Sequence, residues 1–440
     1  MEKFTAWVEK TVAPVAGRLG ANRYIQAIQS TFLTLIPFMT IGSMVLVIIS
    51  PPMDYTTMDP GFAQSFMQGW AALAQFLYLP FTIINMVTTG CLAIWVSAGL
   101  AFFLSRHYKM NSYLPVALAT ACFFATGALD VEGAFTTGYF GGTGLFCAIV
   151  VSIASLEFYR FLCDRNVGRI NLPGMVPPAL SDSMAHLTPA AIVLLVIGVV
   201  GAVALEVTAA PFANLIATIV SPLVGAVNSP GGIMLIGFLM PFFFWFGIHD
   251  SVLTSPLSAF EYANLEANMH AYAAGVAATA LPYTVTPPFI WYFMTIGGNG
   301  ATLALALLCL RSRSKQVSAI GKLGIVPVCF GVNEPIIFGL PVMYNPLMFI
   351  PSILNMVLNA GITYGAMAIG LVNKPFAYPG WNVPAPIGAF LSTMDIRALV
   401  LIIVLIVINL LVYYPFFKAH ERNKLAEEAA EVAPEAAAEA

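Results

Sequence analysis

The residue best suited to chemistry is Glu334, a single carboxylate inside the apolar segment 330–341, which reads FGVNEPIIFGLP. No Lys or Arg occurs from residue 323 to 373, so no cation close in sequence neutralises it. An ionised carboxylate is costly in hydrocarbon, and such residues usually face a water-filled cavity on a substrate path. We therefore expect Glu334 to bind a polar substrate. The alternative is a protonated Glu334, or one that caps a short helix with Pro335 in its first turn.

A second polar pair follows the aromatic run PFFFWF, in the segment 247–256 that reads GIHDSVLTSP. His249 and Asp250 are adjacent there, between a glycine and a downstream proline. This setting favours a role in substrate binding for both residues. Asp250 is equally suited to the N-cap of a helix that begins at Ser251.

Two tryptophans and two asparagines suggest a sugar as the substrate. Flat aromatic rings stack on the apolar faces of sugars, while amide, imidazole and carboxylate groups bind the hydroxyls. Trp245 ends the aromatic run, and Trp381 and Asn382 lie in PGWNVPAPIG. Each tryptophan is equally suited to an interfacial anchor. Asn299, in GGNGA, is equally suited to a turn.

The elements that position these residues are membrane helices. The chain has 440 residues, 59% hydrophobic and 9% charged. Soluble domains carry roughly a quarter charged residues, and repeated apolar runs of about 20 residues can cross a bilayer. The composition predicts an all-α polytopic membrane protein embedded in lipid. The few basic residues form no patch with interleaved aromatics, so we expect no nucleic-acid partner.

We expect about ten transmembrane helices and two re-entrant hairpins, at about 245–256 and 327–346. Non-helical backbone in a membrane is tolerated only where protein or a polar cavity surrounds it. Lys and Arg mark the cytoplasmic side, and their distribution places both termini inside. The expected spans are approximately 25–50, 78–105, 113–129, 141–163, 187–208, 231–248, 271–296, 300–311, 347–372 and 397–417.

The chain divides into four parts. Residues 1–23 form an amphipathic cytoplasmic segment, and residues 24–230 form an N-terminal membrane scaffold. Residues 231–417 are rich in Gly and Pro within apolar sequence and carry most of the candidate site residues. Residues 418–440 form an acidic cytoplasmic tail to which the sequence assigns no function.

Motifs for metals and nucleotide hydrolysis are missing from the sequence. The six cysteines show no C-x-x-C or Cys/His ligand spacing and are best interpreted as small buried hydrophobes. No G-x-x-x-x-G-K-[ST] motif occurs. We expect no metal and no cofactor.

Several segments, in order, resemble the membrane (IIC) subunit of sugar phosphotransferase systems, most closely its lactose/cellobiose/diacetylchitobiose branch. The likeness covers roughly residues 8–417. At 183–185 the chain reads Ser-Met-Ala where the branch has Ser-Phe-Ala or similar. The matching segments are GLFCAI at 144–149, NLPGMVPPALSDSMAHLTP at 171–189, WFGIHD at 245–250, VNEPIIFGLP at 332–341 and GWNVPAPIG at 380–388.

This resemblance implies a homodimer in the bacterial cytoplasmic (inner) membrane. Its N-terminal half would dimerise, and its C-terminal half would bind one disaccharide through the two re-entrant hairpins. The sugar would receive a phosphate at its C6 hydroxyl from a phosphocysteine on a separate IIB protein. The chain would be the transport component of a protein-phosphohistidine–sugar phosphotransferase, with phosphoryl transfer dependent on IIB.

The resemblance also implies individual roles. Glu334 and His249 would bind hydroxyls near the phosphorylated end, with Glu334 as base or orienter. Asn299 and Asn333 would add hydrogen bonds, and Trp245 and Trp381 would stack on sugar rings. The basic loop 311–322 is either a docking surface for IIB or only a determinant of topology.

A different interpretation is a proton- or ion-coupled secondary sugar transporter, in which Glu334, Asp250 and His249 would relay protons. It uses the same broken-helix architecture. An intramembrane enzyme or a channel has no supporting motif. The sequence leaves open which disaccharide is carried.

Overall fold

The computed structural model describes residues 21–51, 55–110, 113–129, 134–170, 177–246, 251–340, 342, 345–380 and 383–438. These residues are mainly helical, and the only β pairing among them is an isolated bridge between Leu129 and Phe135. The expected all-helical fold is confirmed for this part of the chain.

The first half of the chain contains eight α-helices among its described residues. Short 3₁₀ turns occur at η1 (Tyr55–Thr57) and η2 (Gly142–Gly144). The helices are α2 (Arg23–Ile49), α3 (Phe62–Thr88), α4 (Leu92–His107), α5 (Leu114–Gly127), α6 (Leu145–Asp164), α7 (Pro178–Ala185), α8 (Leu187–Thr208) and α9 (Phe212–Val227).

The second half has shorter and more interrupted helices. A 3₁₀ turn, η3 (Ala278–Ala280), and a π-helix, η4 (Phe289–Met294), lie between α11 and α12. The α-helices are α10 (Pro230–Trp245), α11 (Ser251–Ala273), α12 (Leu303–Leu310), α13 (Lys315–Cys329), α14 (Glu334–Gly339), α15 (Pro346–Ala368), α16 (Ala385–Thr393) and α17 (Ile396–Ala438).

Six helical stretches among the described residues are long and apolar enough to cross a membrane. The pair α9 and α10, bent by 69° at its break, makes a seventh if it counts as one span. The total of about ten spans and the two re-entrant hairpins therefore remain predictions. The six stretches are Arg23–Ile49, Phe62–His107, Gly142–Asp164, Leu187–Thr208, Leu347–Ala368 and Ile396–Ala429.

The expected span 271–296 is wrong as a single helix. Helix α11 ends at Ala273, and the chain is largely non-helical until η4 begins at Phe289. Three prolines, Pro282, Pro287 and Pro288, lie in the intervening segment. Proline lacks the N–H that a helix needs and clashes with the preceding turn, so this apolar segment cannot form one continuous helix.

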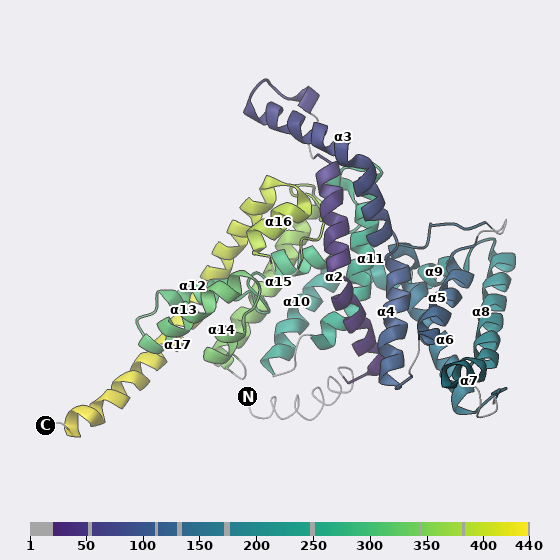
Figure 1. Ribbon diagram of the computed structural model, residues 1–440. Coiled ribbons are helices and arrows are strands. Elements are labelled where there is room, and N and C mark those ends of the chain that lie inside the picture. The colour runs from purple at the N-terminus through teal and green to yellow at the C-terminus, as the bar shows by residue number, and fades with distance from the viewer. Residues whose placement is uncertain are drawn as a thin grey trace.

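Two main hydrophobic cores are built by two groups of helices, which lie in different parts of the ribbon in Figure 1. The first is built mainly by α2, α4, α5 and α6, and the second by α10, η4, α15, α16 and α17. Helix α11 follows residue 230 in sequence, yet its Tyr262, Leu265 and Met269 belong to the first core. This helix therefore packs onto the N-terminal half, although it belongs to the C-terminal half in sequence.

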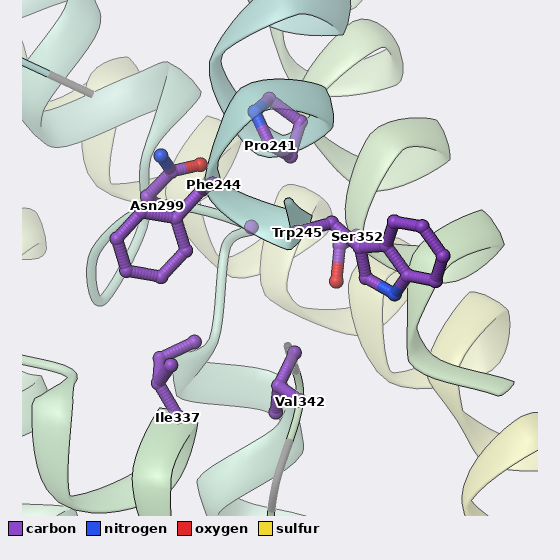
Figure 2. A pocket seen from close by; sticks show the side chains of 8 residues that line it. Pro241, Phe244, Trp245, Asn299, Ile337, Val342 and Ser352 are labelled. Carbon is purple, nitrogen blue, oxygen red and sulfur yellow. The ribbon is translucent and has the colours of Figure 1, made fainter. Parts of the chain in front are cut away.

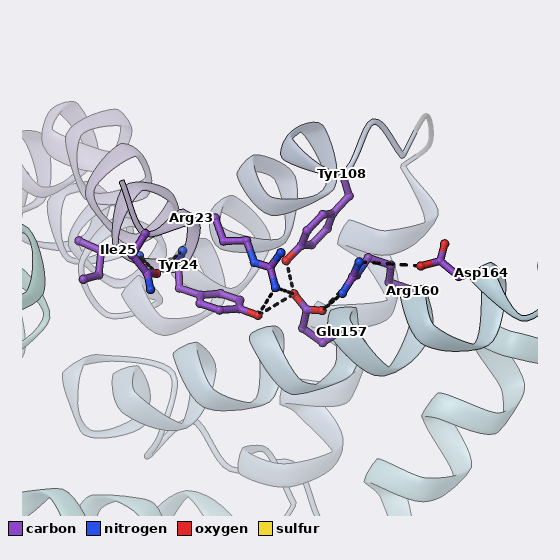
Figure 3. Close-up of polar contacts among 8 residues, drawn as sticks. Arg23, Tyr24, Ile25, Tyr108, Glu157, Arg160 and Asp164 are labelled. Atoms are coloured by element: carbon purple, nitrogen blue, oxygen red, sulfur yellow. Dashed lines mark hydrogen bonds and ion pairs between the residues drawn. The ribbon is translucent and has the colours of Figure 1, made fainter. Parts of the chain in front are cut away.

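A charged cluster around Glu157 ties α2, α4 and α6 together at one end (Figure 3). The Tyr24 hydroxyl donates to Glu157 Oε1 at 2.9 Å, and the Tyr108 hydroxyl donates to the same oxygen. Arg160 donates to Oε2 at 2.8 Å, while the Arg23 guanidinium lies 3.8 Å from Oε1. One carboxylate thus joins the start of α2, the residue after α4 and the last turns of α6.

We predict that Glu157→Gln lowers the free energy of unfolding by about 1–3 kcal/mol, the scale of a hydrogen bond to a charged group. Thermal unfolding of the purified protein in detergent measures the loss. Asp164→Asn is the matched control, because Asp164 is 66% exposed and its carboxylate lies 3.8 Å from Arg160. An exposed pair of this kind contributes about 0–1 kcal/mol. Equal losses of Tm in both variants would contradict the assigned role.

Candidate functional site

A buried, glycine-rich loop lies between η4 and α12. Gly297, Gly298 and Gly300 have φ values of +80°, +103° and +89°, and Ala301 has +54°. This left-handed region is readily adopted by glycine and rarely by other residues. The Thr302 hydroxyl closes the loop by donating to the Gly297 carbonyl at 2.6 Å. The sequence GGNGA therefore produces a compact turn whose carbonyl and amide groups are held inside the protein.

The Asn333 side chain connects this loop to the segment that carries Glu334. Its Nδ2 donates to the Asn299 carbonyl at 2.8 Å and to Thr302 Oγ1 at 3.1 Å. Asn333 is 6% exposed. A Cβ at Gly298 would lie 2.6 Å from Asn333 Cγ, so the close approach requires glycine. The structure thus brings together Asn299 and Asn333, two of the residues singled out from the sequence.

Glu334 is the first residue of α14, immediately after Asn333. It is exposed. Among the described residues it makes no hydrogen bond or ion pair, although Pro335 does occupy the first turn. Its place in the first turn, with Pro335, matches the alternative of a carboxylate at a helix N-terminus, so both interpretations of Glu334 stay open. The carboxylate is available to a ligand, and Asn333 fixes the backbone beside it.

A small cavity lies beside Asn299 (Figure 2). Its volume is about 10 Å³, which is close to the room needed by one water molecule. Asn299 Nδ2 donates to the Met240 carbonyl at 3.3 Å, whereas its buried Oδ1 has no partner among the described residues. A water molecule in the cavity would satisfy that oxygen. The lining residues are Pro241, Phe244, Trp245, Asn299, Gly300, Ile337, Val342 and Ser352.

Trp245 lies in the wall of this cavity and is 7% exposed. Its indole N–H donates to the Asn345 carbonyl at 2.9 Å. Its ring centroid lies 4.6 Å from that of Phe349 on α15. Trp245 is thus packed against protein in this conformation, and its stacking on a sugar stays a prediction.

The remaining predicted site residues, His249, Asp250, Trp381 and Asn382, lie outside the described residues. Their predicted roles stay predictions. The described chain reaches Phe246 just after α10 and resumes at Ser251, where α11 begins.

Residues of α15 and α17 that were not predicted from the sequence also support the glycine-rich loop. The Tyr413 hydroxyl of α17 donates to the Gly300 carbonyl at 2.7 Å and lies 3.1 Å from Ser352 Oγ. The Gly300 N–H approaches Met356 Sδ at 2.9 Å. The only sequence signal is a polar stripe of Ser352, Asn355 and Asn359 at helical spacing on α15.

We predict that Gly298→Ala destabilises the protein, because the new Cβ would clash with Asn333 and alanine resists a φ of +103°. Strain of this kind is of order 1–3 kcal/mol and should lower the Tm in detergent. Gly198→Ala on α8 is the control, since no atom lies within 4 Å of its added Cβ. A Gly298→Ala protein as stable as this control would contradict the proposed packing of Asn333.

Comparisons with known proteins identify the family of the chain. The family model of the phosphotransferase system, EIIC, matches residues 29–355. The chain is 33% identical to the PTS system cellobiose-specific EIIC component of Geobacillus stearothermophilus, over 98% of this chain and 97% of the relative. It is 30% identical to the PTS system lactose-specific EIICB component of Staphylococcus epidermidis, over 97% of this chain and 72% of that protein.

A solved structure extends the likeness to three dimensions. The crystal structure of the transporter ChbC, the IIC component from the N,N'-diacetylchitobiose-specific phosphotransferase system, superposes with a TM-score of 0.87. The two are 29% identical, and the match covers 96% of this chain and 99% of ChbC. The chain belongs to the EIIC family of phosphotransferase-system sugar permeases, which are membrane proteins.

Proposed function

We propose that the protein binds a disaccharide of the cellobiose, lactose or diacetylchitobiose type and carries it across the cytoplasmic membrane. It would present the C6 hydroxyl of the sugar for phosphorylation by a phosphorylated IIB protein. The names of its relatives support this substrate class, since they specify cellobiose, lactose and N,N'-diacetylchitobiose.

The observation that carries the proposal is an exposed carboxylate, which has no hydrogen bond or ion pair among the described residues, next to an anchored amide. Glu334 is exposed and follows Asn333, whose side chain is fixed on the glycine-rich loop. A carboxylate at this position accepts a hydrogen bond from a sugar hydroxyl and orients it. Because the carboxylate is a base, it can also take the hydroxyl proton during transfer.

The C6 oxygen of the sugar attacks the phosphorus of phosphocysteine, and a new O–P bond forms as the S–P bond breaks. The IIB thiolate leaves with the electron pair, while the hydroxyl proton goes to Glu334. The charge on the transferred phosphoryl group makes positioning and electrostatics the main contributions of the permease.

The other predicted site residues complete this proposal. His249 would bind near the phosphorylated end with Glu334, while Asp250 and Asn382 would bind further hydroxyls. Trp245 and Trp381 would stack on the rings. Sugar pockets need about 300 Å³ or more, whereas the cavity beside Asn299 has about 10 Å³. For a sugar to bind at Trp245 and Asn299, the residues that line this cavity would therefore have to move apart.

We also propose a homodimer with both termini in the cytoplasm. The apolar exposed faces of α3 and α8 support burial against lipid or a second copy. Phe76 is 82% exposed on α3, and Leu195 and Val207 are 68% and 78% exposed on α8. Apolar faces of this extent are unfavourable in water, so lipid and the second protomer would share them.

We predict that uptake is coupled to phosphorylation. Right-side-out membrane vesicles that contain the protein would be loaded with phosphoenolpyruvate, the IIB protein and the soluble proteins that phosphorylate IIB. Radiolabelled cellobiose, lactose and diacetylchitobiose would be supplied outside. At least one should accumulate as its phosphate, with little effect of a proton ionophore. Accumulation of free sugar that collapses with the proton gradient would instead show a secondary transporter.

We predict that Glu334→Gln lowers the rate of sugar phosphorylation by about 10²–10⁴-fold, the usual contribution of a general base. Gln keeps an acceptor oxygen, so sugar binding by the purified protein should persist at least in part. Glu206→Gln is the control, since Glu206 is another exposed carboxylate in an apolar segment. A Glu334→Gln protein that phosphorylates sugar at the normal rate would rule out the base role.

A further inference from the structure

The C-terminal part of α17 extends well beyond the length of a membrane span. At about 1.5 Å per residue, its 43 residues are about twice as long as the roughly 30 Å hydrocarbon core. Figure 1 shows this part of the helix projecting from the body of the protein at the yellow end of the chain. The sequence analysis assigned no function to the acidic tail that includes it.

Glu421, in this extension, holds the loop between α12 and α13. Its Oε1 accepts a hydrogen bond from Ser312 Oγ at 2.7 Å and another from the Arg313 backbone N–H at 2.8 Å. Its second oxygen lies 2.6 Å from Lys418 Nζ. Glu421 is 3% exposed. Both oxygens of the Glu421 carboxylate therefore have partners, Oε1 in the loop and Oε2 on its own helix.

Glu428 repeats the contact two helical turns further along α17. Its Oε1 accepts from Ser314 Oγ at 2.6 Å and from the Gln316 backbone N–H at 3.0 Å. Ser314 in turn is the N-cap of α13 and accepts from the Val317 N–H. Residues seven apart lie on nearly the same face of a helix, so Glu421 and Glu428 form one continuous brace along the loop.

This brace leaves the basic side chains of the loop exposed. The two glutamates bind backbone N–H groups and serine hydroxyls, while no ion pair involving a loop cation occurs among the described residues. A cluster of like charge without a carboxylate partner attracts an anionic surface and steers its approach. The exposed cations are Arg311 and Arg313 in the loop, Lys315 at the first position of α13, and Lys322 farther along α13.

The loop lies within reach of the candidate phosphorylation site. Helix α13 connects it to the segment that carries Glu334, and its 15 residues span about 22 Å at 1.5 Å per residue. A compact partner domain of about 100 residues has a radius of gyration of about 13 Å. One such domain, docked on the loop, can therefore extend as far as Glu334.

We propose that Glu421 and Glu428 are positioning residues that brace loop 311–316, and that the braced loop is a docking surface for the phosphorylated IIB protein. This inference rests on the proposed function, because it assigns a place to the phosphoryl donor. The bound face of the partner is expected to be acidic. Contact between the loop and anionic lipid headgroups is the competing outcome of the test.

The test uses Glu428, because removal of the deeply buried Glu421 is more disruptive to the helix. The full-length protein in detergent would phosphorylate cellobiose, or whichever of the three sugars is transported, with purified phosphorylated IIB as donor. Glu428→Ala should raise the KM for phospho-IIB by about threefold or more through loss of electrostatic preorganisation. The kcat and the Kd for sugar should stay unchanged, and Glu428→Gln should restore most of the affinity because it keeps an acceptor.

Glu427→Ala is the matched control. Glu427 is adjacent on α17 and is 59% exposed, with an ion pair to Lys424. It makes no contact with the loop among the described residues. If Glu428→Ala gives the same KM as this control, the brace is wrong.

A variant that lacks two of the exposed cations distinguishes an error in the brace from an error in the docking surface. Arg313→Gln combined with Lys315→Gln should raise the KM for phospho-IIB. If it does so while Glu428→Ala has no effect, docking holds and only the brace fails. If the effect of the charge variant occurs only in anionic-lipid vesicles and not in detergent, the loop binds headgroups and the docking proposal is wrong. If wild-type protein transfers no phosphate to any sugar, the proposed function itself fails.

Discussion

The candidate site depends on the two hydrogen bonds donated by the Asn333 amide. They join the glycine-rich loop to the start of α14 across 34 positions in sequence. Both segments have irregular backbone, whose polar groups need partners inside the protein. Without this amide, the Asn299 carbonyl would lose a donor, and the backbone beside Glu334 would lose its anchor. The segment that carries the carboxylate is therefore held by a neutral amide, and no counter-ion to Glu334 occurs among the described residues.

The two halves of the molecule use different interactions for stability. In the N-terminal half, the Glu157 carboxylate contacts two tyrosines and two arginines where the ends of three helices meet. In the C-terminal half, amides, hydroxyls and carbonyls hold the loop, with Tyr413 and Ser352 on its second side. With this neutral support, no cation holds the Glu334 side chain among the described residues, so a sugar hydroxyl can approach it. A Lys or Arg at the same place would instead form a salt bridge with Glu334 and compete with the sugar hydroxyl for its carboxylate.

Apolar runs were sufficient to predict the helical membrane fold. Polar interruptions drew attention to the segment of Asn333 and Glu334, and the structure holds Asn333 on the glycine-rich loop, while the role of Glu334 stays a prediction. These patterns failed at 271–296, where apolar composition hid the effect of Pro282, Pro287 and Pro288 on the backbone. They also missed Tyr413 and Glu428, whose loop partners lie more than 100 positions away. Such contacts leave no local periodicity, because they arise only when separate helices pack together.

The central claim is that Glu334 contacts the hydroxyl that becomes phosphorylated. The most direct measurement is a high-resolution structure of the full-length protein with a transported disaccharide bound. The C6 hydroxyl oxygen is expected to lie about 2.6–3.2 Å from a carboxylate oxygen of Glu334, the range for proton transfer. A bound sugar whose C6 hydroxyl is directed away from α14, or a sugar bound elsewhere, would show that Glu334 does not contact this hydroxyl.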